Sequence, residues 1–91
     1  MKSFEWDENK NEVLKLNRHI SFEEVVFLIA NDFVLDIVAH PNLLKYPNQR
    51  MFIINVDNYA YLVPFIEEKE IIYLKTIIPS RKATKKYLKR R

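Results

Sequence analysis

The chain has 91 residues, enough for one domain (1–91) built from one sheet and two or three helices. It contains no cysteine, which excludes disulfide bonds and thiolate metal sites and fits a reducing, cytosolic setting. No apolar run approaches the roughly 20 residues of a membrane-spanning helix. We therefore expect a cytoplasmic protein with no membrane partner.

The net charge of +3 is unevenly distributed along the chain. Residues 80–91 contain seven of the 15 basic residues and no acidic one, so the remaining 79 residues hold 8 basic against 12 acidic, a net −4. A basic tail on an acidic body can bind phosphates or an acidic protein. The alternative is a solvated terminal helix whose cations complement its own dipole.

The first half of the chain predicts two helices. Residues 4–6 are interpreted as a short edge strand or an apolar plug. Asp7 has the position of an N-cap, and we expect a helix from there to about Asn17. Ser21 begins an S-x-x-E capping box. The second helix then carries an amphipathic stripe, formed by Phe22, Val25, Val26, Ile29 and Phe33.

The second half predicts a sheet. Residues 34–38 are a candidate strand, and residues 40–49, with two prolines, are a loop that is long enough to line a site. Alternating apolar residues then predict three antiparallel strands, at 50–56, 59–66 and 71–78. Because the chain has no glycine, we expect Asp57 and Asn58 to form the first hairpin turn.

Ser80 is placed to cap a final basic helix. Its expected cationic stripe is formed by Lys82, Lys85, Lys86 and Lys89, and its packing side by Ala83, Tyr87 and Leu88. The predicted fold class is α+β: an antiparallel sheet of three or four strands packed against two N-terminal helices, with a basic C-terminal helix.

The sequence contains no metal-ligand spacing, and without glycine it has no phosphate-binding loop, so no metal and no cofactor are expected. His19, between two helices, has two interpretations. Its imidazole can carry a proton in a reaction, or it ends a helix and interacts with the exposed carbonyls.

Four cations are expected to meet on one surface, where they would hold a phosphodiester and neutralise charge in a transition state. Arg50 opens the first long strand, Lys75 lies in the last one, and Arg81 and Lys82 follow it. Tyrosines that alternate with aliphatic residues in these strands either stack on bases or bridge core and surface.

Three blocks of the sequence resemble the BrnT family of bacterial toxins: FEWDENK at 4–10, RHISFEEV at 18–25 and IIPSRKATKKYL at 77–88. The resemblance implies a RelE-like ribonuclease, held inactive by a cognate antitoxin of the ribbon-helix-helix type that carries the complex to operator DNA. By position, His19 matches the family's motif histidine, Arg81 the motif arginine and Lys82 the lysine after it. Arg50 matches an arginine that opens the first long strand.

The leading hypothesis is a type II toxin that cleaves RNA without a metal, by attack of the ribose 2′-OH on the adjacent phosphate. Arg50 and Arg81 would hold the phosphate, and His19 or Tyr87 would carry the proton. Lys75, Lys82, Lys85 and Lys86 would bind the substrate. A second hypothesis is a non-catalytic module that binds an antitoxin-like partner or nucleic acid, and a third is a plain RNA-binding domain.

Overall fold

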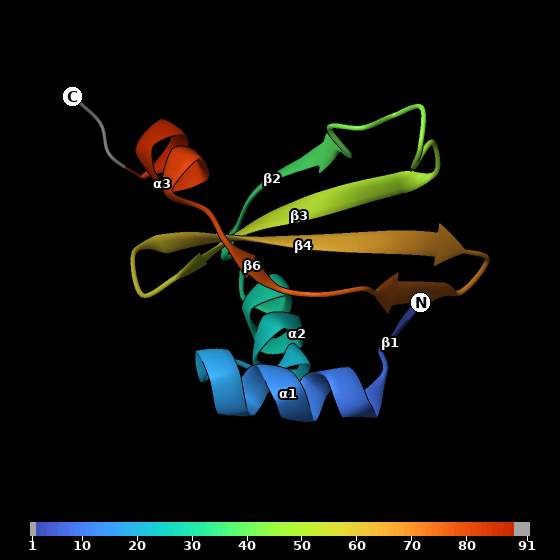
Figure 1. The fold of residues 1–91 in the computed structure, drawn as a ribbon, viewed down its shortest axis with the longest axis horizontal. Coiled ribbons are helices and arrows are strands. Elements are labelled where there is room, and N and C mark those ends of the chain that lie inside the picture. The colour runs from blue at the N-terminus through green and yellow to red at the C-terminus, as the bar shows by residue number, and fades with distance from the viewer. Residues whose placement is uncertain (1, 89–91) are drawn as a thin grey trace.

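The computed structural model describes residues 2–88, which form three helices and six strands (Figure 1). In chain order these are β1 (Ser3–Glu5), α1 (Glu8–Arg18), α2 (Phe22–Ala30), β2 (Val34–Ala39), β3 (Gln49–Val56), β4 (Tyr59–Glu68), β5 (Ile71–Leu74), β6 (Ile78–Pro79) and α3 (Arg81–Tyr87). The predicted α+β class is confirmed. No helix in this part of the chain is both long and apolar enough to cross a membrane.

The sheet is mixed and larger than expected. Its strands lie in the order β1-β5-β4-β3-β2, and β6 pairs with the first half of β4. All pairs are antiparallel except β1 with β5. The short edge strand that was one interpretation of residues 4–6 is present as β1, but it pairs in parallel, so the predicted antiparallel sheet of three or four strands is corrected to a larger, mixed one. The predicted strand 71–78 is divided into β5 and β6.

The division of the last strand has a cause in the strand beside it. The backbone N–H of Lys75 donates to the carbonyl oxygen of Pro64 in β4. Pro64 has no N–H of its own to donate back, so the ladder loses a hydrogen bond there. Residues 75–77 depart from the sheet at this point, and pairing resumes at Ile78 opposite Leu62.

The helix starts follow the expected caps. The Asp7 carboxylate accepts from the N–H of Asn9 at 2.8 Å, and the Ser21 hydroxyl oxygen accepts from the N–H of Glu24 at 3.1 Å. The second helix ends earlier than predicted. Ala30 is its last residue, and Asp32 adopts a left-handed φ of 67°. Phe33 therefore lies outside the helix.

The two-residue turn between β3 and β4 forms as predicted. Asp57 and Asn58 have φ values of 52° and 66°, the left-handed geometry that both side chains tolerate. Lys69 takes the same region at the next hairpin, with φ 50°. In this glycine-free chain, polar residues make the turns.

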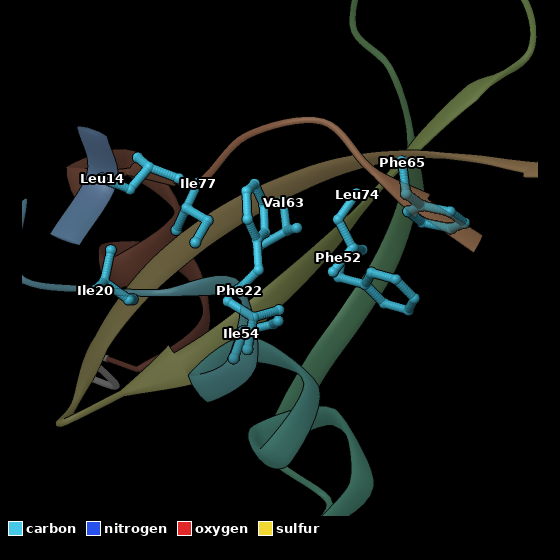
Figure 2. Packing of buried hydrophobic residues seen from close by; sticks show 10 residues of the cluster. Leu14, Ile20, Phe22, Phe52, Ile54, Val63, Phe65, Leu74 and Ile77 are labelled. Atoms are coloured by element: carbon cyan, nitrogen blue, oxygen red, sulfur yellow. The ribbon is translucent and has the colours of Figure 1, made fainter. Parts of the chain in front are cut away.

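One face of the sheet packs against α1 and α2 and holds the main core (Figures 1 and 2). The buried residues of this cluster are Leu14, Ile20, Phe22, Val25, Phe52, Ile54, Val63, Phe65, Leu74 and Ile77. In Figure 2, Leu14 of α1 lies beside Ile77, and Phe52 of β3 beside Phe65 of β4. The two phenylalanine rings stack with centroids 4.2 Å apart.

The opposite face of the sheet packs against α3 (Figure 1). Ile53 of β3 and Ala60 of β4 form a second, smaller buried cluster with Ala83 of the helix. This follows from strand alternation, because Met51 and Ile53 point away from the face that holds Phe52 and Ile54. The sheet is thus covered on both sides, which the sequence prediction did not specify.

Candidate functional site

Helix α3 is fixed to the sheet by a short hydrogen-bond network. The hydroxyl oxygen of Thr84, which is 2% exposed, accepts from the N–H of Ala60 at 2.8 Å. The same hydroxyl donates to the carbonyl oxygen of Ser80, and the N–H of Ser80 donates to the carbonyl oxygen of Ala60. Ser80 also caps the helix by accepting from the N–H of Ala83. These bonds attach the helix to the beginning of β4.

The outer side of α3 is cationic. Arg81, Lys82, Lys85 and Lys86 are all exposed. Among residues 2–88, no acidic side chain forms an ion pair with Arg81, Lys82 or Lys85. The Lys86 ammonium lies 5.3 Å from the ring centroid of Tyr87. The predicted stripe is therefore present for these residues, and Lys89 lies outside the described residues.

An open groove of about 360 Å³ runs beside α3 on the same face of the sheet. Its floor comes from β2, β3 and β4, and one rim comes from α3. We call it the α3 groove; its lining residues are Val38, Ala39, Pro41, Met51, Ile53, Leu62, Ser80, Lys82, Ala83, Lys86 and Tyr87. The floor is aliphatic, and the two lysines stand on the helical rim.

Tyr87 holds the end of α3 against strand β2. Its hydroxyl donates to a carboxylate oxygen of Asp36 at 2.6 Å, and the other oxygen accepts from the N–H of Ile37. The bond from Tyr87, followed by that N–H, lowers the pKa of Asp36. The same bond raises the pKa of Tyr87. The phenol therefore keeps its proton, and that proton is used in the hydrogen bond to Asp36.

Arg50 lies on the other face of the sheet, toward α1 and α2. It pairs in register with Phe65, and its guanidinium carbon lies 5.2 Å from the centroid of that ring. Its guanidinium also bonds the Glu67 carboxylate at 2.6 Å, and Lys2 contacts the same carboxylate at 3.0 Å. The bond from Lys2, with the charges of both cations, lowers the pKa of Glu67. Arg50 is therefore held within an ion-pair network.

Arg50 and Arg81 do not meet. The first belongs to the face that carries α1 and α2, whereas the second begins α3 on the opposite face. They are also separated along β4, because Arg50 lies opposite Phe65 and Ser80 bonds to Ala60. Five residues of a strand span about 17 Å. The expected convergence of these arginines on one surface is therefore wrong.

Lys75 and Lys82 do share a face. Lys75 lies 5.3 Å from the ring centroid of Tyr73. That ring points away from the main core, because it alternates with the buried Leu74. Lys75 is thus on the side of the sheet that carries α3, together with the substrate-binding lysines predicted on that helix.

His19 ends α1 as its C-cap, with a left-handed φ of 57°. It lies beside a surface hollow formed with Lys15, Ile20, Ser21 and Glu24. This position agrees with the second interpretation of His19, as a residue at a helix C-terminus. It belongs to the α1–α2 layer, on the other side of the sheet from α3.

The sequence prediction missed the groove and the Asp36 partner of Tyr87. One signal was present: both alternating sets of β3 are apolar, which is typical of a strand covered on both faces. The Asp36 contact had no local signal, because the two residues are 51 positions apart.

In the described part of the chain, no three His, Asp or Glu side chains are grouped to hold a metal ion. No protein-family model, no curated protein and no solved structure matches this chain. The residues of α3 and its groove are therefore the basis on which its function is inferred.

Proposed function

We propose that this protein is the toxin component of a type II toxin–antitoxin pair of the BrnT type, with a RelE-like fold, and that it inhibits translation by binding RNA with the face that carries α3. A cognate antitoxin, of the ribbon-helix-helix type that also binds operator DNA, would neutralise it in the cytoplasm.

The observation that carries this proposal is the unpaired positive charge of α3. Arg81, Lys82 and Lys85 have no ion-pair partner within residues 2–88, and all three are exposed. Lys75 adds a further cation on the same face, next to the ring of Tyr73. Unpaired cations beside a partly exposed aromatic ring provide the phosphate contacts and the stacking surface that a single-stranded nucleic acid uses.

The positions of the family-like blocks support the fold part of the proposal. The first block contains the N-cap Asp7, the second contains the N-cap Ser21, and the third contains the N-cap Ser80. Each block therefore begins a helix. Such residues specify where elements start, so the resemblance supports a shared architecture more directly than a shared chemistry.

The contacts on the face that carries α3 favour RNA binding over RNA cleavage. Attack by the ribose 2′-OH needs a proton acceptor beside the phosphate, and the predicted carriers are not available on this face. His19 belongs to the α1–α2 layer, and the hydroxyl proton of Tyr87 is donated to Asp36. These contacts favour the second candidate function, a member of the family that binds RNA or its partner without cutting.

The proposal is tested by inducible expression in a bacterial host, alone and with the adjacent small reading frame. We expect growth arrest that co-expression relieves. Replacement of α3 cations, as in the double variant Arg81→Glu/Lys85→Glu, should abolish the arrest, whereas Arg50→Gln should leave it unchanged. An arrest that depends on Arg50 and not on α3 would contradict the assignment of the RNA-binding face.

The two candidate functions are separated with purified protein and labelled single-stranded RNA. Intact RNA in a retarded complex would favour binding without cleavage. Shortened RNA with 2′,3′-cyclic phosphate ends would establish the nuclease.

A further inference from the structure

We propose that the α3 groove is the docking site for an acidic amphipathic segment of a partner protein. The segment would place aliphatic side chains on the groove floor and carboxylates against the lysine rim. This goes beyond RNA binding by α3, since it assigns the groove beside the helix, whose rim includes Lys82 and Lys86 of the cationic side, to a separate class of ligand.

The floor of the groove fits aliphatic side chains. Met51 and Ile53 are 7% and 4% exposed, and Val38 and Leu62 beside them are partly exposed. These four side chains come from three neighbouring strands that are hydrogen-bonded to one another. A volume of about 360 Å³ is at the lower end of the 300–1,000 Å³ typical of ligand pockets. It accommodates the anchor residues of a segment, such as those at i, i+3 or i+4 of a helix.

The same floor does not fit a nucleobase. Unpaired bases are recognised by stacking on rings and by hydrogen bonds to their edges. The ring in this groove is Tyr87, whose hydroxyl is bonded to Asp36 and whose ring is already paired with the Lys86 ammonium. The hydroxyl oxygen of Ser80 accepts from the N–H of Ala83. The groove therefore favours a protein ligand over RNA.

The rim determines the charge of the ligand. Lys82 and Lys86 are four residues apart on α3, so they lie on one side of the helix, facing the groove. The nearby Asp36 carboxylate accepts from Tyr87 and Ile37 and attracts the charge of Lys86, but it forms no ion pair with either lysine among residues 2–88. A segment with Asp or Glu next to its apolar anchors complements both features, whereas a basic segment is repelled.

Lys85 provides a matched control within the same helix. It is exposed and carries the same charge as Lys82, but it does not line the groove. RNA binding to the cationic side of α3 would use both residues. Docking in the groove would use Lys82 and not Lys85, so the two activities respond differently to the same pair of substitutions.

The test begins with a random peptide library displayed on phage and selected on the purified full chain. We expect a consensus of Leu, Ile or Met at helical spacing, flanked by Asp or Glu.

The affinity of the best peptide is then measured by fluorescence anisotropy. Lys82→Glu should weaken this affinity about 5- to 10-fold, because an attraction at the rim becomes a repulsion. Val38→Glu should weaken it at least as much. Lys85→Glu should change it less than about twofold. Circular dichroism confirms that each variant is folded.

Three results would overturn the proposal. The first is a selected consensus that is basic, or no consensus at all. The second is equal weakening by Lys82→Glu and Lys85→Glu, which would indicate a diffuse charge effect. The third is a single-stranded RNA oligonucleotide that loses affinity on Val38→Glu while no peptide does, which would assign the groove to RNA.

Discussion

The bond between Tyr87 and Asp36 favours the ionised form of the carboxyl and opposes ionisation of the phenol. The phenol donates to the carboxylate at 2.6 Å, which lowers the pKa of Asp36 and raises that of Tyr87. A lowered carboxyl pKa contributes stability above its usual value near 3.8, and that stability is lost as the pH falls through the folded-state pKa. A raised phenol pKa contributes stability below its usual value near 10, lost as the pH rises through the folded-state pKa.

The substitution Tyr87→Phe should therefore destabilise the protein by an amount that depends on pH. The difference in melting temperature between the wild type and Tyr87→Phe should be largest between about pH 5 and pH 9. It should shrink in acid, where Asp36 is protonated in both proteins. Thermal unfolding across this range measures it, with Tyr59→Phe at the exposed hairpin as control. A difference that is constant from acid to neutral pH would show that the lost stability does not come from the bond to the ionised Asp36 carboxylate.

Single residues could be predicted from the sequence where the rule is local. Asp7, Ser21 and Ser80 were identified as helix caps because the acceptor and the donor are within three residues of each other. Asn11 had no such signal. It is fully buried, and it accepts from the N–H of Phe22 and donates to Glu23, across the joint between two helices.

Among the elements, α3 depends most on one buried polar side chain. Thr84 both accepts from Ala60 and donates to Ser80, and Val has nearly the same shape without the hydroxyl. Thr84→Val leaves the buried N–H of Ala60 without an acceptor, which should cost about 1–3 kcal/mol of unfolding free energy. Denaturant unfolding measures this loss, and faster amide exchange at Ala60 should accompany it.

The control is Lys85→Ala, on the exposed side of the same helix, which should change stability by less than about 0.5 kcal/mol. Equal losses in both variants would mean that the bond to Ala60 does not hold the helix.

Element types were predictable, and most element partners were not. The stripe of α2 identified the buried Phe22 and Val25, but it also included Phe33, which is 43% exposed, and β3 is buried on both faces. The turn at 57–58 specified one partner, the pairing of β3 with β4. The break between β5 and β6 depends on Pro64 in the neighbouring strand. The face chosen by α3 depends on contacts with Ala60 and Ile53, which lie more than 20 residues earlier. Neither is visible within a window of local sequence.

For the whole molecule, the sheet separates two groups of cations. On the α1–α2 face, Arg50 and Lys2 both pair with the Glu67 carboxylate. On the other face, Arg81, Lys82 and Lys85 form no ion pair among residues 2–88. The sequence prediction of one cationic site was wrong for two reasons. Composition counts charges without showing which of them are paired. Strand alternation also places Arg50 on the α1–α2 face of the sheet, away from α3.

This separation predicts how RNA binding responds to salt. Each phosphate contact on a single strand contributes about −0.7 to the slope of log K against log salt concentration. If Arg81, Lys82, Lys85 and Lys86 each contact one phosphate, the slope is about −2.8, and affinity falls about 50-fold between 50 and 200 mM salt.

Lys85→Ala should reduce the magnitude of this slope by about 0.7, whereas Arg50→Gln should leave it unchanged, because that guanidinium is already paired with Glu67. Titrations of a labelled oligonucleotide at several salt concentrations measure these slopes. A slope that changes with Arg50 as much as with Lys85 would mean that RNA reaches both faces of the sheet, and that the ion pair with Glu67 opens to admit it.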